Sequence, residues 1–320
     1  MKENKAIRTF KTLLITQGAL FALIILVIVA VSLFPSLART RVILDILRGY
    51  SMIGVVAMGM TFVIISGGID LSVGSIAALS GITAALLTDK FWLIPALGAI
   101  AVGALLGCVN GIVIAKLKAP PFIATLAMMM GARGLILIIT GERPLRFKAQ
   151  NEAYLQISQG NFLGIPNLVW IFAIIVVICI VASKWTRFGR SVYVLGGNEE
   201  AAKMMGFSTD RIKISVYTIS GLMSGIAGMM LTSWLSSAQN TAGQGWELTA
   251  IGAVVIGGTL LAGGRGKFSG TVYGVLIYAV IEVLLGRFSL MVWWINIFTG
   301  CLIIGVVILQ SQSIKLKIQQ

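Results

Sequence analysis

The side chains best placed for chemistry in this sequence are a few polar groups inside long apolar runs. Asp70 and Ser72 lie in Gly67-Gly68-Ile69-Asp70-Leu71-Ser72-Val73-Gly74, which interrupts an otherwise continuous hydrophobic stretch. Such a break lets the chain reverse or unwind where protein or water, and not lipid, surrounds it. Asp70 suits the N-cap of the helix that follows, and it equally suits the mouth of a translocation path. The sequence leaves both roles open.

A second break follows late in the chain, at Gly257-Gly258-Thr259-Leu260-Leu261-Ala262-Gly263-Gly264. Each break has a paired glycine followed by another glycine five or six residues later, between apolar helices. Transporters often show such internal echoes, so the pattern hints at an internal repeat.

Two further polar side chains, Arg133 and Asn110, lie within apolar runs. Arg133 falls in the middle of one, where a guanidinium is costly unless it is paired or wetted, and an ion pair and a substrate contact are both open to it. Asn110 lies inside the small-residue ladder Gly103-x3-Gly107-x3-Gly111, which we expect to let helix backbones pack closely, and it can bond across helices or line a polar path. The candidate partners of Arg133 are Asp45, Glu247 and Glu282. The residues we assign to the path or to the helix breaks are Gly67, Gly68, Asp70, Ser72, Gly74, Asn110, Arg133, Glu247, Gly257, Gly258, Gly263 and Gly264.

Several kinds of chemistry are excluded or unsupported. The chain has no histidine, which removes Ser-His-Asp triads and HExxH zinc sites. Its three cysteines have no CxxC spacing, so neither a disulfide framework nor a metal site is predicted. Gly264-Arg265-Gly266-Lys267 resembles a phosphate loop, but Leu261 occupies the position of its first glycine and Phe268 that of its Ser/Thr. We therefore expect no catalytic residues, no cofactor and no ATP bound by this chain.

The composition requires lipid as the solvent. Of 320 residues, 58% are hydrophobic and 11% are charged, against about 25% charged in ordinary domains; the mean hydropathy is +0.97. The net charge of +14 is spread thinly between apolar runs and forms no contiguous basic face for nucleic acid. It is typical of topogenic charge on membrane loops.

We predict an all-α polytopic transmembrane bundle of about ten spans, each with about 20 mostly apolar residues. With both termini in the cytoplasm, about twice as many Lys and Arg residues fall inside as outside, which agrees with the positive-inside rule. The expected spans are Leu13–Phe34, Val42–Ser66, Ser72–Leu87, Trp92–Leu117, Pro121–Thr140, Pro166–Ser183, Ile214–Leu235, Glu247–Ala262, Phe268–Leu285 and Leu290–Leu309.

Only two hydrophilic segments exceed a turn, residues 141–165 outside and 184–213 inside. Neither can bury a core of its own, so residues 1–320 form a single transmembrane domain. The inner segment encodes a short helix, with Asn198 as N-cap, Glu199 and Glu200 at the positive end of the dipole and Gly206 at the left-handed C′ position. Its Ala201, Ala202, Met204 and Met205 are apolar. They make the helix a docking-surface candidate, and the other interpretation is a helix on the bilayer or under the spans.

Together, the Gly-Gly-Ile-Asp-Leu-Ser break, the loop helix and Ala253–Gly264 resemble the permease subunits of bacterial ABC importers for ribose and related monosaccharides. The resemblance runs from about Arg41 to the last span. Permeases for branched-chain amino acids usually carry a different sequence at the first break, which favours sugar. The resemblance implies a coupling helix that receives the stroke of the ATPase, formed by Gly197, Asn198, Glu199, Glu200, Ala201, Ala202, Met205 and Gly206.

The same resemblance implies the partners and the cell compartment. They are an ATP-binding subunit with two nucleotide-binding modules, a periplasmic or lipid-anchored sugar-binding protein, and a second permease subunit, in the inner membrane of a bacterium. The expected function is passage of a ribose-like pentose or a hexose. The alternatives are a permease for autoinducer-2 or another small polar solute, and an ion-coupled secondary transporter. A secondary transporter predicts titratable groups near the midplane, whereas most acids here lie near span ends.

Overall fold

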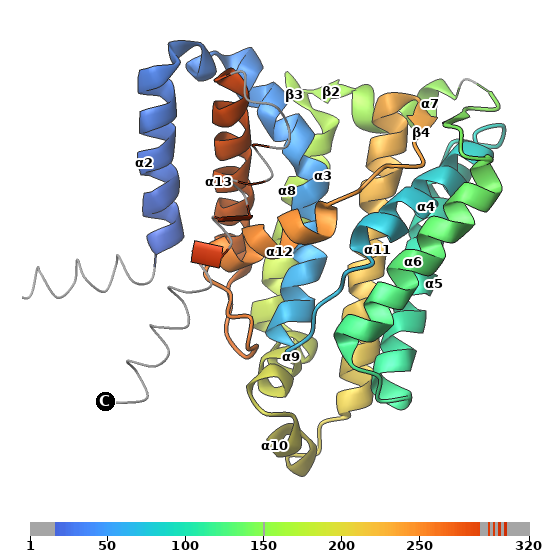
Figure 1. Cartoon of the computed structure of the whole chain (residues 1–320), viewed down its shortest axis with the longest axis vertical. Coiled ribbons are helices and arrows are strands. Elements are labelled where there is room, and N and C mark those ends of the chain that lie inside the picture. The colour runs from blue at the N-terminus through green and yellow to red at the C-terminus, as the bar shows by residue number, and fades with distance from the viewer. Residues whose placement is uncertain are drawn as a thin grey trace, which may run out of the picture.

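The computed structural model describes residues 17–149 and 151–288, with six isolated residues beyond them at 294, 297, 300, 301, 304 and 305. Figure 1 shows a bundle of helices that run mostly alongside one another. The elements are α2 (Gly18–Leu33), η1 (Pro35–Ala38), α3 (Thr40–Ile65), α4 (Val73–Leu86), α5 (Leu93–Lys116), α6 (Pro121–Thr140), β1 (Leu145–Arg146), α7 (Glu152–Gln159), β2 (Asn161–Phe162), β3 (Ile165–Pro166), α8 (Asn167–Trp185), α9 (Arg187–Gly197), α10 (Glu199–Met204), α11 (Thr209–Leu235), β4 (Ser237–Ala238), α12 (Trp246–Ile256) and α13 (Phe268–Arg287).

Six helices of the described chain are long and apolar enough to cross a membrane, namely α3, α5, α6, α8, α11 and α13. The predicted span Ser72–Leu87 agrees with α4 to within one residue at each end, whereas the predicted span Glu247–Ala262 is too long, because α12 ends at Ile256. At 14 and 11 residues, α4 and α12 rise about 21 Å and 17 Å, well short of a hydrocarbon core of about 30 Å. Neither crosses such a core as a single helix. The predicted span Leu290–Leu309 lies outside the continuous described ranges, as do residues 13–16 of the first span.

Helix α11 occupies the centre of the bundle, packed against α3, α4 and α5. Glycines on α5 and α11 bring the two backbones into direct contact: a β-carbon added to Gly103 would lie 2.7 Å from Gly225 Cα, and one added to Gly107 would lie 2.9 Å from Gly221 Cα. This confirms the prediction that the small-residue ladders serve close packing.

Both breaks begin with the same helix ending. After α3, Gly67 adopts a left-handed conformation (φ 85°), its N–H donates to Ile64 O, and Gly68 N–H donates to Val63 O. After α12, Gly258 (φ 89°) donates to Val255 O, and the next N–H, of Thr259, donates to Val254 O. These are Schellman motifs, which need a residue that tolerates positive φ. The local geometry of the two breaks thus repeats, as the sequence echo hinted.

The two ends of the bundle differ in what covers them. At one end, here called the α7 end, residues 141–165 form α7 and two-residue strands, with β1 paired antiparallel to β4 and β2 to β3. The sequence indicated only a loop there. At the other, the α10 end, the predicted loop 184–213 is shorter than expected, because α8 continues to Trp185 and α11 already begins at Thr209. Between them α9 and α10 fold as separate helices (Figure 1).

Candidate translocation site and coupling helix

A closed hydrogen-bond cluster holds the first break. The Asp70 side chain is fully buried, and its Oδ1 accepts from the Ser72 N–H at 2.9 Å and the Ser72 hydroxyl at 2.6 Å. Its Oδ2 accepts from the Ser220 hydroxyl at 2.8 Å, and Asn110 Nδ2 donates to Ser72 Oγ at 2.9 Å. Because a buried carboxylate is costly unless its oxygens are hydrogen-bonded, the cluster ties the break to α4, α5 and α11 together. In this conformation Asp70 has no surface with which to touch a solute.

Two hydroxyls near the same cluster face the peptide that precedes Asp70. Tyr217 Oη and Thr125 Oγ1 each lie 3.4 Å from Ile69 O. Tyr217 also fills the space that a β-carbon on Gly68 would need, so only glycine fits there. The non-helical chain between α3 and α4 is thus contacted on several sides by α6 and α11.

Arg133 hydrogen-bonds to main-chain atoms, and among the described residues it forms no salt bridge with a carboxylate. Its Nη1 donates to Asn240 O at 3.1 Å and to Ala242 O at 2.8 Å. Of the three acids considered, Glu247 is near enough for its charge to act on Arg133, whereas Glu282 lies beside Tyr50. The guanidinium therefore anchors the chain between α11 and α12, which Figure 1 shows running from β4 down to the start of α12.

The same chain packs on the beginning of α4. A β-carbon on Gly74 would collide with Gly243 O and would lie 2.8 Å from Glu247 Oε2. The starts of the two short helices, α4 and α12, therefore meet inside the bundle. Discontinuous helices whose N-termini meet at membrane depth are a common framework for solute sites in transporters.

Glycines from both breaks meet the end of α9, immediately before α10. Gly264 N–H donates to Ile65 O at 2.8 Å. A β-carbon on Gly263 would lie 2.9 Å from both Gly196 O and Gly67 Cα, and one on Gly264 would lie 2.9 Å from Gly197 Cα. We call the five glycines of this contact, Gly67, Gly196, Gly197, Gly263 and Gly264, the glycine junction. The sequence predicted the breaks, but it gave no sign that they touch each other and the coupling segment at one point.

Helix α10 forms as its caps predict. Asn198 Oδ1 accepts from Ala201 N–H at 2.9 Å. At the other end Gly206 has φ 82°, and Gly206 N–H donates to Lys203 O while Phe207 N–H donates to Ala202 O, a third Schellman motif. Gly197 and Glu200 are exposed in this segment. Helix α10, about one and a half turns long, is thus capped at both ends by residues of this chain.

The apolar face of α10 is smaller than the sequence indicated. Ala202 is fully buried and Ala201 is half-buried, so Ala202 is not free to dock. The exposed apolar side chains are Met204 and Met205, at 88% and 60% of their full accessible surface. The physical reason is that α10 packs one side against α9 and α11 and leaves its C-terminal end free.

An ion-pair network fastens α10 to α11. Glu199 pairs with Lys203 at 2.9 Å and with Lys213 at 2.7 Å. Partial burial by itself would raise the pKa of the Glu199 carboxyl, but the hydrogen bonds and charges of Lys213 and Lys203 outweigh it and lower the pKa below its usual value. The ionised form of Glu199 is therefore the one that holds α10 in place.

Comparison with known proteins identifies the family. A family model described as "Branched-chain amino acid transport system / permease component" matches residues 42–307. The chain belongs to this permease family. The permease is 42% identical over 275 residues to the ribose import permease protein of Haemophilus influenzae, covering 84% of each chain. It is 42% identical over 301 residues to that of Bacillus subtilis, covering 92% of each. It is 37% identical over 270 residues to the L-arabinose transport system permease protein of Escherichia coli, covering 83% of this chain and 81% of that one. No solved structure matches the permease.

Membership and the apolar helices make the permease a multi-pass protein of a bacterial inner membrane and a transport subunit, not an enzyme. Sequence reasoning missed Ser220 and Tyr217 as parts of its central cluster. A signal for Ser220 was present, because Ser220, Gly221, Ser224 and Gly225 repeat small residues at helical spacing along α11. Small polar residues in that pattern often bond across helices in membranes.

Proposed function

We propose that this permease passes a monosaccharide, such as ribose, through the membrane as one subunit of an ABC importer. The observation that carries the proposal is the identity of 42% to ribose import permeases over most of both chains, with a pentose permease among the further relatives. A separate ATP-binding subunit supplies the energy, a sugar-binding protein delivers the solute, and a second permease subunit completes the path. In this assembly the α10 end faces the cytoplasm, which the positive-inside rule supports.

In this proposal α10 is the coupling helix, and Met204 and Met205 are its contact with the ATPase. An exposed, independently capped helix with two large apolar side chains is suited to a groove on a partner. Motion of α10 would pass through the glycine junction, since Gly196 and Gly197 touch both breaks. The closed Asp70 cluster supports a structural role for Asp70, which is not the N-cap itself but accepts from the N-cap residue Ser72 and so keeps the first break in shape while its surroundings move.

Reconstitution tests the proposal. The permease in proteoliposomes with its ATPase subunit and sugar-binding protein should take up D-ribose only when ATP is supplied, and a lesion in the ATP site of the ATPase should abolish uptake. Uptake by the purified permease alone, or uptake driven by a proton or sodium gradient without ATP, would refute it.

A variant of α10 tests the coupling step separately. Met205→Asp places a charge on the exposed contact surface and should abolish ATP-driven uptake while the permease still inserts and retains its melting temperature. Met130→Asp is not a suitable control, because Met130 is an exposed residue of the apolar helix α6 and lies far along the chain from α10. Ser208→Asp, which places the same charge on an exposed residue beside α10 but outside the coupling helix, is the matched control and should keep uptake. Wild-type uptake by Met205→Asp would remove α10 as the coupling element.

A further inference from the structure

The chain between α11 and α12 is unusual for its place in a membrane protein. Residues 236–245, which we call the descending segment, read Ser-Ser-Ala-Gln-Asn-Thr-Ala-Gly-Gln-Gly. Apart from β4 the segment forms only turns and irregular backbone. Alanine is its only residue with an apolar side chain. It also carries no formal charge.

Two contacts fix its depth. Arg133, which binds the carbonyls of residues 240 and 242, lies seven residues before the end of α6 at Thr140, or about 10 Å along the helix. Further along, Gly243 packs against Gly74, twelve residues before the end of α4 at Leu86, or about 18 Å from that end. The descending segment therefore starts at the α7 end and runs roughly halfway through the bundle.

The polar side chains at that depth are available. Thr241 and Gln244 are exposed, and Asn240 and Glu247 are half-buried. Within the described ranges the structure gives the Thr241 and Gln244 side chains no hydrogen-bond partner. Irregular backbone and polar side chains are not tolerated against hydrocarbon, and they occur at membrane depth only where protein buries them or a water-filled cavity borders them. The exposed edge of the descending segment therefore borders either another protein surface or a water-filled space, and its exposed hydroxyl and amide, with no large apolar side chain, favour the water-filled space.

The chemistry of this edge selects the class of solute. A hydroxyl, a primary amide and a nearby carboxylate can donate to and accept from the hydroxyls of a sugar. A charged solute would find little to pair with, because the segment is uncharged and the Arg133 guanidinium is occupied by two carbonyls, with the charge of Glu247 acting on it. The edge thus matches a neutral, polyhydroxylated molecule and not an amino-acid zwitterion.

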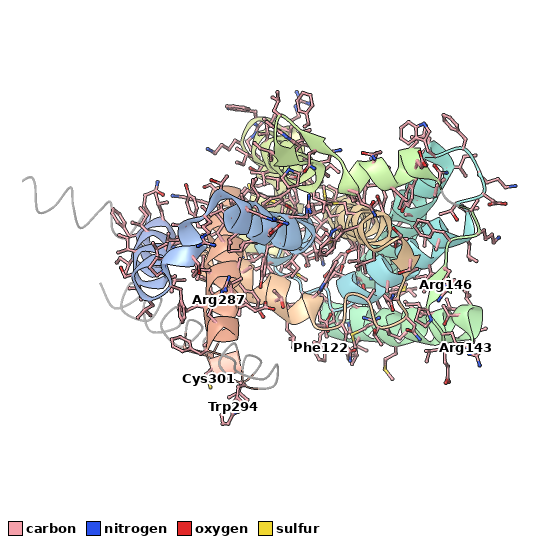
Figure 2. All side chains as sticks on the ribbon, turned by 90° about the horizontal axis from the view of Figure 1, so that it is seen from above. Phe122, Arg143, Arg146, Arg287, Trp294 and Cys301 are labelled. Carbon is pink, nitrogen blue, oxygen red and sulfur yellow. The ribbon has the colours of Figure 1, made fainter. Side chains whose placement is uncertain are left out.

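We propose that the descending segment is the solute-contacting wall of the translocation path, with Thr241 and Gln244 as hydrogen-bonding residues for a neutral polyhydroxylated solute. The inference rests on the proposed function, because it assumes that a solute crosses this subunit. In Figure 2, which views the bundle from above, Arg143 and Arg146 lie on the α6 side and Arg287 lies on the α13 side.

Cysteine accessibility provides the first test. Thr241→Cys and Gln244→Cys are made in a permease whose native cysteines are replaced by alanine, and membranes are treated with a charged, membrane-impermeant thiosulfonate. Both positions should react, and reaction at Gln244 should slow in the assembled transporter while D-ribose is being transported. Ile138→Cys, on α6 at 79% exposure, is the lipid-facing control and should not react. Absence of reaction at both segment positions would overturn the proposal.

Transport kinetics provide the second test and need no cysteine replacement. In the proteoliposomes described above, Thr241→Val and Gln244→Ala should each lower ATP-driven D-ribose uptake about three- to tenfold, the equivalent of one lost hydrogen bond, with ATP hydrolysis and assembly retained. Wild-type uptake by both variants would overturn this inference and leave the proposed function standing. If the wild-type assembly itself takes up no D-ribose, the proposed function fails as well, so the two failures are distinguishable.

Discussion

Replacing Gly196 by alanine should disrupt the glycine junction, whereas the same change one residue later should not. A β-carbon on Gly196 would overlap Ile65 O and would lie 2.7 Å from Gly264 N. To reach an ordinary contact the neighbours must shift by about 0.7 Å or more, which breaks the 2.8 Å hydrogen bond from Gly264 N–H to Ile65 O. Leaving those groups unpaired costs about 1–3 kcal/mol, and overpacking adds about 1–3 kcal/mol.

The control is built into the chain. Gly197, the next residue of α9, has no atom within 4 Å of its would-be β-carbon, so Gly197→Ala should be neutral or should stabilise by about 0.4–1 kcal/mol through the unfolded state. Thermal unfolding of the purified permease in detergent, followed by tryptophan fluorescence, compares the two. ATP-driven sugar uptake and ATP hydrolysis, measured on the same variants in the full transporter, should separate only for Gly196→Ala. Equal melting temperatures and equal uptake for the two variants would show that the junction carries neither stability nor motion.

Three further outcomes are expected. Gly107→Ala, which pushes α5 away from α11, should lower the melting temperature by several degrees, while Gly131→Ala on the open face of α6 should not. Equal melting temperatures for the two variants would contradict the backbone contact. Asp70→Asn should insert and fold, because its amide oxygen can still accept from Ser72, whereas Asp70→Ala leaves buried donors unpaired at about 1–3 kcal/mol each and should fold poorly; similar detergent-extracted yields would argue against the cluster. The ionised Glu199 stabilises α10, and because its pKa is lowered in the folded state, this contribution is present above the ordinary glutamate pKa and is lost as the pH falls through the folded value. The protection of the α10 amides from hydrogen exchange, relative to the intrinsic exchange rate at each pH, should therefore fall at acidic pH and should already be low at neutral pH in Glu199→Gln. Unchanged protection in that variant would remove the ion pairs as the cause.

The sequence predicted the features that depend on a few neighbouring residues. The caps of α10, the glycine ends of α3 and α12 and the close ladder of α5 all follow from local sterics, and the structure confirms each. The end of α12 could not be predicted in the same way. Hydropathy measures how apolar a stretch is and not where its helix ends, so α12 together with the apolar residues of the second break has the hydropathy of one longer helix.

Contacts between distant parts of the chain were also beyond the sequence. For Arg133 an ion pair and a substrate contact were both open, and its bonds to main-chain carbonyls could not be predicted, because carbonyls are present at every residue and leave no mark in the sequence. The burial of Ala202 depends on how α10 lies against α9 and α11, and a helix of six residues is too short for its apolar pattern to indicate a face. Ser220 lay in a recognisable small-residue pattern, yet its partner Asp70 is 150 positions away.

The grip of Arg133 on the descending segment has an evolutionary consequence. The guanidinium holds carbonyl oxygens at residues 240 and 242, and every amino acid supplies a carbonyl. Substitutions along this stretch change what the wall presents while its anchor stays the same. A single scaffold can in this way diversify the cargo it admits by exchanging a handful of side chains, without redesign of the helices that hold them.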